Sequence, residues 1–281
     1  MTFRIGANNY GKQRVRLLRV SRSGEQNHVK ELTLGIRFEG DFEMAHTVGD
    51  NSKILPTDTM KNTVYALARK SPVASVEDFS LLLIEHFLKG NRHTTRVSVE
   101  AKEDLWTRIL VGRKEHPAAF VRSGGERRTA LLDATREKTV IRSGLENLTL
   151  MKTTQSAFDG FIRDPYTTLK ESRDRILATS VRADWLFGSG AIDFDAVWEG
   201  VRDTIMEVFA EHVSESVQHT LFVIGDAVLG RFDQIREIQL SLPNKHYNLV
   251  NLEPFGLDNP GEVFLPTDEP HGLIEATVQR D

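Results

Sequence analysis

The sequence has 281 residues, of which 40% are hydrophobic and 27% charged, a balance typical of a folded protein of about two domains and one that excludes wholesale disorder. A formal net charge of −4 argues against a nucleic-acid-binding protein. Cysteine is absent, which excludes disulfides, thiolate nucleophiles, iron–sulfur clusters and cysteine zinc sites. The sequence opens without a signal-peptide pattern and has no apolar run near the ~20 residues of a membrane span, so we expect a cytoplasmic protein that binds neither membrane nor nucleic acid.

The chain begins with two segments of alternating character. Val15–Val20 and Leu32–Phe38 place apolar residues at every second position, which predicts two strands that are wet on one face. The polar segment Ser21–Asn27 around Gly24 predicts a hairpin turn between them. A loop is expected over Thr47–Pro56.

Two helices are predicted next. Thr57 or Asp58 is expected to cap the first helix, and Ser75 to cap the second, which Gly90 ends. Each helix has an apolar face at helical spacing. The first face comprises Met60, Val64, Leu67 and Ala68, and the second Phe79, Leu82, Leu83, His86 and Phe87.

The remaining elements repeat this order without repeating the letters. Strand patterns follow the two helices, and the second half of the chain again predicts two strands, two helices and two strands. The expected strands are Thr95–Ala101, Trp106–Val111, Ala118–Val121, Leu148–Lys152, Ala178–Phe187, Gln234–Leu242 and Gly272–Val278, and the expected helices are Phe194–His212 and Thr220–Phe232. The fold class is therefore α+β. The weakly patterned stretch Gly124–Gly144 is the expected boundary, which gives units at residues 1–136 and 137–281.

Several short motifs lack the residues that known sites need. Gly225 and Gly230 have the spacing of a phosphate-binding loop, but Arg231-Phe232 replaces its Lys-Ser/Thr pair, so a helix interior is expected. Gly188-Ser189-Gly190 is too short for a nucleophile elbow and is expected to be a turn. The 9 histidines show no metal-ligand spacing, so no metal site is expected. Arg127-Arg128 is expected to be a solvated turn.

The polar clusters beside the predicted elements carry a family signature. In chain order they are Tyr10-Gly11-Lys12 with Val15-Arg16; Asp50-Asn51-Ser52; Thr57-Asp58 with Lys61-Asn62-Thr63; Gly160-Phe161 with Arg163-Asp164; Tyr166-Thr167-Thr168-Leu169-Lys170-Glu171; Asp174-Arg175-Ile176-Leu177; Ser216-Val217-Gln218; Leu242 to Tyr247; Glu262-Val263-Phe264; and Gly272-Leu273-Ile274. Each block alone is weak. Together they span the chain in register, and the sequence resembles the urate oxidase (uricase) family.

The resemblance implies a fold and an assembly. Members of this family have the tunnelling fold (T-fold), in which two tandem strand-strand-helix-helix-strand-strand units make up each subunit and a homotetramer closes a barrel. The active sites lie between subunits, so Lys12, Thr57 and Asp58 of one chain are expected to meet the other site residues of its neighbour. A monomer is therefore expected to be inactive. The C-terminal peroxisomal tripeptide of animal and fungal members is missing, so the chain looks like a bacterial member.

The reaction that the resemblance implies is the oxidation of urate by O2 and water to 5-hydroxyisourate and H2O2, with no cofactor and no metal. By resemblance, Lys12, Thr57 and His246 form the proton relay. The assignment is chemically reasonable because a desolvated lysine can accept a proton, a threonine hydroxyl both donates and accepts, and a histidine can polarise water.

The resemblance also implies a cradle for the flat urate anion. Its expected members are Thr57, Asp58, Phe158, Arg175, Val217, Gln218 and Asn244. An arginine fork suits the anionic edge of a purine, an aromatic ring stacks on its face, and glutamine offers one donor and one acceptor to an amide edge. The backbone N–H groups of Asp58 and Val217 are expected to bind substrate, and Asn244 to hold water or O2.

Alternatives stay open for single residues and for the whole chain. Taken alone, Thr57 is a helix cap, Phe158 a core aromatic residue, and Arg175 the partner of Glu171 or Asp174. A pterin or purine hydrolase or aldolase on the same fold is the second hypothesis, but Gln218 stands where those enzymes use glutamate, and no zinc spacing is present. A non-catalytic purine-binding tetramer is the third, although it has no need of the relay residues.

Overall fold

The computed structural model describes residues 3–188 and 190–281. The chain folds as two compact units, Met1–Gly144 with Ala191–Asp195 and Leu145–Gly190 with Ala196–Asp281. Among the described residues, no helix is long and apolar enough to cross a membrane.

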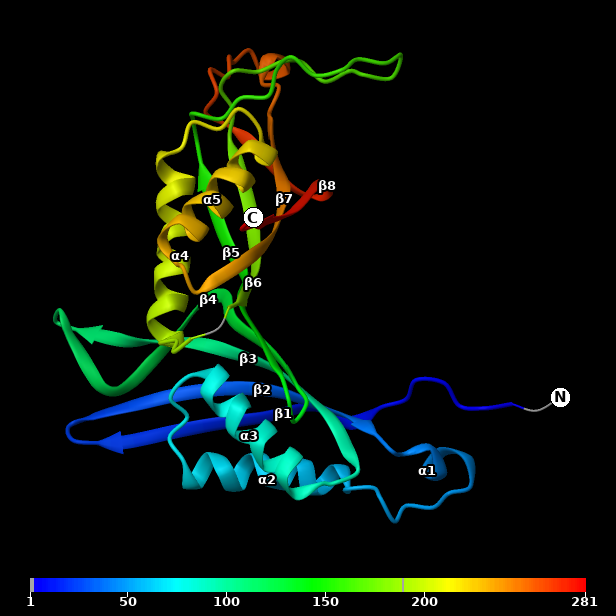
Figure 1. Cartoon of the computed structure of the whole chain (residues 1–281). Helices are drawn as coiled ribbons and strands as arrows, with labels where there is room; N and C mark the ends of the chain where they lie inside the picture. Colours follow the sequence, from blue (N-terminus) through cyan, green and yellow to red (C-terminus); the bar gives the residue numbers. More distant parts are fainter. Residues whose placement is uncertain (1–2, 189) are drawn as a thin grey trace. The chain divides into compact units, whose positions relative to one another are not determined.

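The first unit contains a long antiparallel sheet and two main helices (Figure 1). Its elements are β1 (Tyr10–Ser23), β2 (Gln26–Gly40), α1 (Glu43–Thr47), α2 (Thr57–Lys70), α3 (Val76–Gly90), β3 (Thr94–Val111) and β4 (Lys114–Ala134). The strands pair in chain order, with Tyr10 opposite Phe38 and Ile36 opposite Val99. Since antiparallel neighbours can be joined by a tight turn, β1 and β2 form one hairpin, and β3 and β4 form another.

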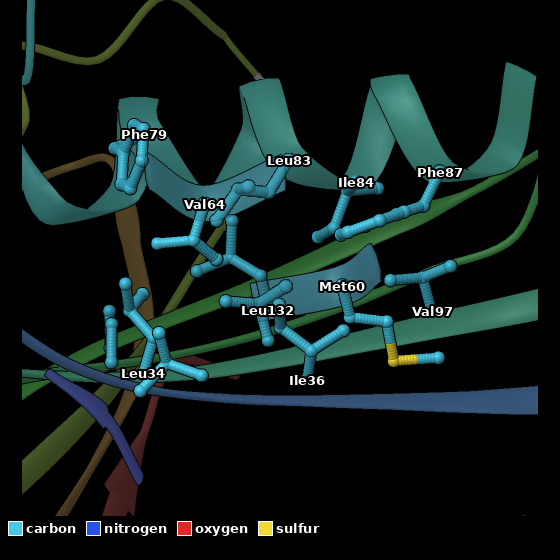
Figure 2. Close-up of a cluster of buried hydrophobic side chains, with 14 of the residues drawn as sticks. Leu34, Ile36, Met60, Val64, Phe79, Leu83, Ile84, Phe87, Val97 and Leu132 are labelled. Carbon is cyan, nitrogen blue, oxygen red and sulfur yellow. The ribbon is translucent and has the colours of Figure 1, made fainter. Parts of the chain in front are cut away.

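Alternate residues of β2 build the core of this unit. Leu34 and Ile36 point toward the helices and are buried with Met60 and Val64 of α2 (Figure 2). Phe79, Leu83 and Phe87 of α3 complete the cluster. A strand places every second side chain on one face, so the residues between, such as Thr33 and Gly35, lie on the opposite face of the sheet. The helices therefore cover one face only.

The second half of the chain repeats the pattern. Its elements are β5 (Thr139–Lys152), β6 (Leu177–Phe187), α4 (Phe194–Glu211), α5 (Val217–Arg231), β7 (Ile235–Leu249), the 3-10 turn η1 (Glu253–Phe255) and β8 (Phe264–Gln279). Helix α5 packs on β7 and β8. The contact is close, because a Cβ placed on Gly225 would come within 2.5 Å of Val278. Gly225 is thus a packing residue inside a helix, as predicted.

The predicted α+β order of the main strands and helices is confirmed. Thr95–Ala101 and Trp106–Val111, predicted as separate strands, form the single strand β3, and the short α1 and η1 were not predicted. Ser75 caps α3, its hydroxyl accepting from the backbone N–H of Asp78 at 2.9 Å. The weakly patterned stretch 124–144 is strand on both sides of a turn, and the predicted boundary at residues 136–137 falls in that turn between β4 and β5. The predicted turn at residues 188–190 includes Ser189, which lies outside the described residues.

Three local predictions are wrong. Pro56 occupies the N-cap position of α2, so Thr57 and Asp58 belong to its first turn and neither caps it. His86 is exposed and does not belong to the buried stripe of α3. Arg127-Arg128 is not a turn, because both residues lie within β4. Local patterns give no sign of the partner that draws a charged residue such as Arg128 inward.

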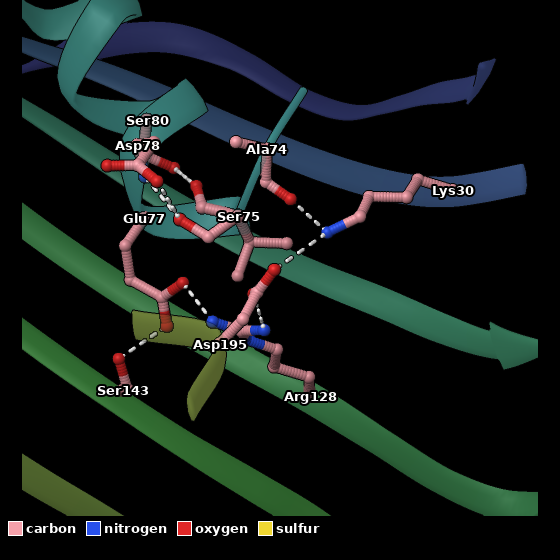
Figure 3. Close-up of polar contacts among 10 residues, drawn as sticks. Lys30, Ala74, Ser75, Glu77, Asp78, Ser80, Arg128, Ser143 and Asp195 are labelled. Carbon is pink, nitrogen blue, oxygen red and sulfur yellow. Dashed lines mark hydrogen bonds and ion pairs between the residues drawn. The ribbon is translucent and has the colours of Figure 1, made fainter. Parts of the chain in front are cut away.

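Arg128 is at the centre of a buried ionic network in the first unit (Figure 3). It is only 4% exposed, and it donates to the carboxylate of the fully buried Glu77 at 2.6 Å. It also pairs with Asp195, while Ser143 donates to the other oxygen of Glu77. Buried charges of this kind require partners, because an unpaired charge in the interior costs several kcal/mol. The network therefore joins α3, β4 and β5 in the interior of this unit.

Candidate active site

Three of the nine predicted site residues, Lys12, Thr57 and Asp58, belong to the first unit. Lys12 lies on β1 immediately before a β-bulge, because the register with β2 shifts between Lys12 and Val15. Gly11 precedes it where the backbone of β2 comes very close, and a Cβ at this position would collide with the carbonyl oxygen of Ile36. Glycine is therefore required beside Lys12, and the bulge interrupts the regular strand alternation immediately after it.

Tyr10 connects β1 to the loop that leads to Thr57. Its hydroxyl accepts a hydrogen bond from the backbone N–H of Leu55 at 2.9 Å. Its ring packs edge-on against Phe38 and Phe42, with centroids 5.8 and 4.8 Å away. Burial raises the pKa of the Tyr10 hydroxyl, so this group stays protonated. Tyr10 thus fixes the strand of Lys12 against the segment that begins α2.

Thr57 and Asp58 form the open N-terminus of α2. The first backbone N–H groups of a helix have no acceptor within it and favour anionic ligands. The Asp58 carboxylate turns back along the helix and accepts from Lys61 and Asn62 at 2.5 and 2.9 Å. Hydrogen bonding and charge from Lys61, with a further contribution from the charge of Lys12, lower the pKa of Asp58. Lys12 is therefore electrostatically coupled to the start of α2.

The other six predicted residues belong to the second unit, where Phe158 and Arg175 are in direct contact. The guanidinium of Arg175 lies 5.2 Å from the centroid of the Phe158 ring. Phe158 also stacks on Phe161, with centroids 5.0 Å apart and planes inclined by 13°. Burial lowers the pKa of the half-buried Arg175, and its buried Nε atom has no hydrogen-bond partner. The pair presents a flat, cationic surface with a donor to spare.

The neighbouring acids do not pair with Arg175 as the simpler alternative expected. Asp174 accepts instead from the hydroxyl of Thr154 and the backbone N–H of Gln155, at 2.9 and 2.8 Å. Glu171 pairs with Arg163 at 3.7 Å. Phe158 is half-buried and therefore is not a core residue.

Backbone hydrogen bonds bring the Phe158–Arg175 pair beside the start of α5. Phe158 exchanges two bonds with Ser172, at 2.7 and 3.1 Å. Arg175 donates its backbone N–H to Ser156, which itself bridges to Ser214 just before α5. The loop that carries both side chains is thus fixed at the N-terminus of α5.

Val217 and Gln218 are the first two residues of α5. The side chain of Ser216 caps the helix, accepting from the backbone N–H of His219 at 3.1 Å. Val217 is buried and Gln218 is exposed, so the glutamine side chain is accessible to a ligand. As at α2, the first backbone N–H groups lack acceptors within the helix.

Asn244 and His246 lie on β7, on either side of a second irregularity. The register between β7 and β8 shifts between Asn244 and His246. Asn244 pairs with Thr179 of β6, a strand that begins two residues after Arg175. Both side chains are half-buried. The second unit therefore brings Phe158, Arg175, Val217 and Gln218 together at the start of α5, with Asn244 and His246 on the sheet nearby.

Comparison with known proteins gives the family. The family model described as Uricase matches residues 8–133 and 141–275. Uricase from Arthrobacter globiformis is 46% identical over 99% of this chain and 90% of its own length, and uricase from Danio rerio is 40% identical over 96% and 93%. The chain belongs to the uricase family.

Solved uricase structures have the same fold. The crystal structure of uricase from Arthrobacter globiformis aligns with a TM-score of 0.94, at 46% identity, and covers 100% of this chain and 96% of that one. A hyperthermostable R298C mutant of Bacillus sp. TB-90 urate oxidase is 26% identical, has a TM-score of 0.85 and covers 97% and 99%. The tandem T-fold class predicted from the sequence agrees with these structures.

Three supporting residues were not predicted from the sequence to have a role. Tyr10, Ser214 and Ser216 touch none of the chemistry directly, yet they position Lys12, the Phe158 loop and Gln218. Tyr10 and Ser216 both stand in the family blocks, and Ser216 also leaves a local signal, because serine before an apolar helix predicts an N-cap. The Leu55–Tyr10 bond joins residues 45 positions apart and has no such signal. Across the described part of the chain, no group of three or more acidic, histidine or cysteine residues is placed to hold a metal ion.

Proposed function

We propose that this protein oxidises urate with O2 and water to 5-hydroxyisourate and H2O2, as an enzyme of urate breakdown. Family membership over nearly the whole chain supports the reaction. The observation that carries the assignment to this chain's own residues is the half-buried Arg175, whose Nε has no partner and whose guanidinium covers the Phe158 ring beside α5. A planar anion fits such a site better than a flexible or cationic one.

The proposed cradle uses the second-unit residues. Arg175 donates its fork to the anionic edge of urate, and Phe158 stacks on the purine face. Gln218, accessible at the start of α5, donates to and accepts from the adjacent amide edge. The N–H of Val217 and the side chain of Asn244 bind oxygens of the substrate or of the reacting water. These interactions orient urate without changing its charge.

The proposed relay uses Lys12, Thr57 and His246. Thr57 passes a proton between substrate and Lys12, and its neighbour Asp58 binds substrate through its backbone N–H. Bound urate that has lost a proton is electron-rich, so it can reduce O2 directly. His246 then polarises the water that completes the hydroxylation. We propose that this chemistry needs neither metal nor organic cofactor.

The proposed assembly is a homotetramer of tandem T-fold units at residues 1–136 and 137–281, in which each site lies between two subunits. The support is that Lys12, Thr57 and Asp58 belong to the first compact unit and the six other proposed site residues to the second. A cytoplasmic location is part of the same proposal, supported by the absence of cysteine. Cell fractionation tests the location, and light scattering of the purified protein tests the assembly.

The reaction itself is tested with chelator-treated protein in an oxygen electrode with peroxide detection. We expect urate to drive O2 uptake, matched mole for mole by H2O2. Xanthine, which lacks the 8-oxo group, serves as the control substrate. Uptake that disappears after chelation and returns with a metal would contradict the cofactor-free mechanism, and urate binding without uptake would contradict catalysis.

A further inference from the structure

The first unit contains a hollow on the face of its sheet that the helices leave bare. Its volume is about 470 Å³, and β1 to β4 all contribute to it. Thr33 and Gly35 of β2 form part of its floor, opposite the buried face of Leu34 and Ile36. Gly35 leaves room there, since a Cβ at this position would collide with the side chain of Gln13. None of the nine predicted active-site residues lines the hollow.

The lining of this hollow is strongly cationic. Its positive side chains are Arg14, Arg16, Lys102, Arg122 and Arg127, and its only carboxylates are Glu100 and Asp104, which leaves a net charge of +3. The whole chain has a net charge of −4, so the concentration of positive charge is local. Positive charge in a concave site attracts anions more strongly than the same charge on a flat surface.

Two of the arginines are held in place by one buried carboxylate. Asp104 is 8% exposed, and it accepts from Arg122 and from the Nε of Arg127 at 2.6 Å. One negative charge therefore fixes two guanidinium groups. Because each guanidinium has five N–H donors in a rigid plane, the arrangement is preorganised for an acceptor with several oxygens.

The β-bulge adds a third arginine to the rim. Arg14 lies within the register shift of β1 and has φ of 58°, a left-handed conformation that is unfavourable for any residue but glycine. Its neighbour Arg16 bonds to Glu31 at 2.5 Å. The strained position of Arg14 thus directs one more cation into the same hollow.

We propose that this hollow binds a small polyvalent oxyanion such as phosphate. Arg14, Arg122 and Arg127 supply hydrogen-bond donors, and the volume of the hollow admits a small molecule. Glu100, the second carboxylate of the lining, opposes the binding of an anion by charge repulsion. The site is separate from the proposed urate chemistry and does not depend on it.

The test is a calorimetric titration of the full-length protein with inorganic phosphate at low ionic strength. Arg14→Gly with Arg16→Gln should weaken binding about tenfold, because two cations are lost. Glu100→Gln should strengthen it several-fold. Lys70→Gln is the matched control: it removes an exposed cation at the end of α2, outside the hollow, and should change binding by less than about twofold. A parallel titration with adenosine monophosphate distinguishes the source, since tighter binding than phosphate identifies a phosphomonoester ligand and weaker binding identifies the free ion.

Three results would overturn the proposal. They are no heat of binding up to about 20 mM phosphate, equal affinity in the wild type and the arginine double variant, and loss of binding in Arg175→Gln, which would locate the anion at the urate cradle instead. If the variant with Arg14→Gly and Arg16→Gln fails to fold, Glu100→Gln still tests the proposal, because its affinity for phosphate should rise.

Discussion

Arg175 differs from an ordinary surface arginine in three ways. It is half-buried, it lies over the Phe158 ring, and its buried Nε has no acceptor. A buried donor without a partner costs about 1–3 kcal/mol, so such a group is favoured where a ligand supplies the missing acceptor. Although burial lowers its pKa, an arginine retains its charge at neutral pH. At the scale of single residues, this is the strongest sign that the second unit binds an anion.

Substitutions in the relay and in the cradle should change different kinetic constants. Lys12→Met or Thr57→Ala should lower kcat by about 10²–10⁴-fold with little change in KM, because a proton-transfer group acts mainly in the transition state. Arg175→Ala should instead raise KM, since it binds the ground state as well. Steady-state kinetics with urate measure both. Lys70→Met, an exposed lysine at the end of α2, is the control. An unchanged KM in Arg175→Ala would contradict the cradle.

At the scale of elements, the first unit depends on charges that the sequence pattern did not reveal. Arg128 bonds to Glu77, which is 51 positions away, and the pair lies between β4 and α3. A twin-arginine sequence predicts a solvated turn when it is examined locally, and only the tertiary fold supplies the buried carboxylate. By contrast, the alternation of Leu32 to Phe38 and the Ser75 cap are local signals, and the structure confirms them. Local propensity therefore predicted the element order, whereas the ionic network required the fold.

Glu103 of β3 gives this network a pH dependence. Burial raises its pKa, against the lowering influence of Lys30 and Arg128; Asp195 and Glu77 raise it further. A carboxyl group with a raised pKa in the folded state binds its proton more tightly there than in the unfolded chain. Its contribution to stability is therefore complete below the unfolded pKa of about 4.3 and is lost as pH rises through the folded pKa.

Glu103→Gln should remove this loss. We expect its Tm to exceed that of the wild type at pH 8 by about 2–4 °C, the shift that 1 kcal/mol gives in a protein of this size, and the difference to shrink toward pH 5. Thermal unfolding over this pH range is the measurement. Glu85→Gln, an exposed carboxylate on α3, should leave Tm unchanged at both pH values. A lower Tm for Glu103→Gln at pH 8 would mean that attraction to Lys30 and Arg128 outweighs the cost of burial.

At the scale of the whole molecule, the division of the site residues between the two units is the notable fact. Lys12, Thr57 and Asp58 belong to one unit and the six others to the second. The blocks that predicted the family lie in both halves, so all nine proposed site residues could be assigned from the resemblance. The sequence could not show which of these residues are held by the same hydrogen bonds, because bridges such as that between Ser156 and Ser214 join loops far apart in the chain. The proposed chemistry follows from the family resemblance, whereas the hydrogen bonds that hold these loops together required the fold.

The proposed sharing of each site between subunits predicts complementation. At urate concentrations well below the raised KM of Arg175→Ala, Lys12→Met and Arg175→Ala should each be nearly inactive. Co-expression with two different affinity tags yields mixed tetramers. If one chain supplies Lys12 and its neighbour Arg175, about a quarter of the sites in a random mixture combine two intact halves, and about a quarter of the wild-type activity should return. Lys12→Met mixed with Thr57→Ala is the matched control: both lesions lie in the same half, so every site keeps one of them and activity should stay low. Absence of recovery in the first mixture, or activity in a dilute monomer, would place the whole site within one chain.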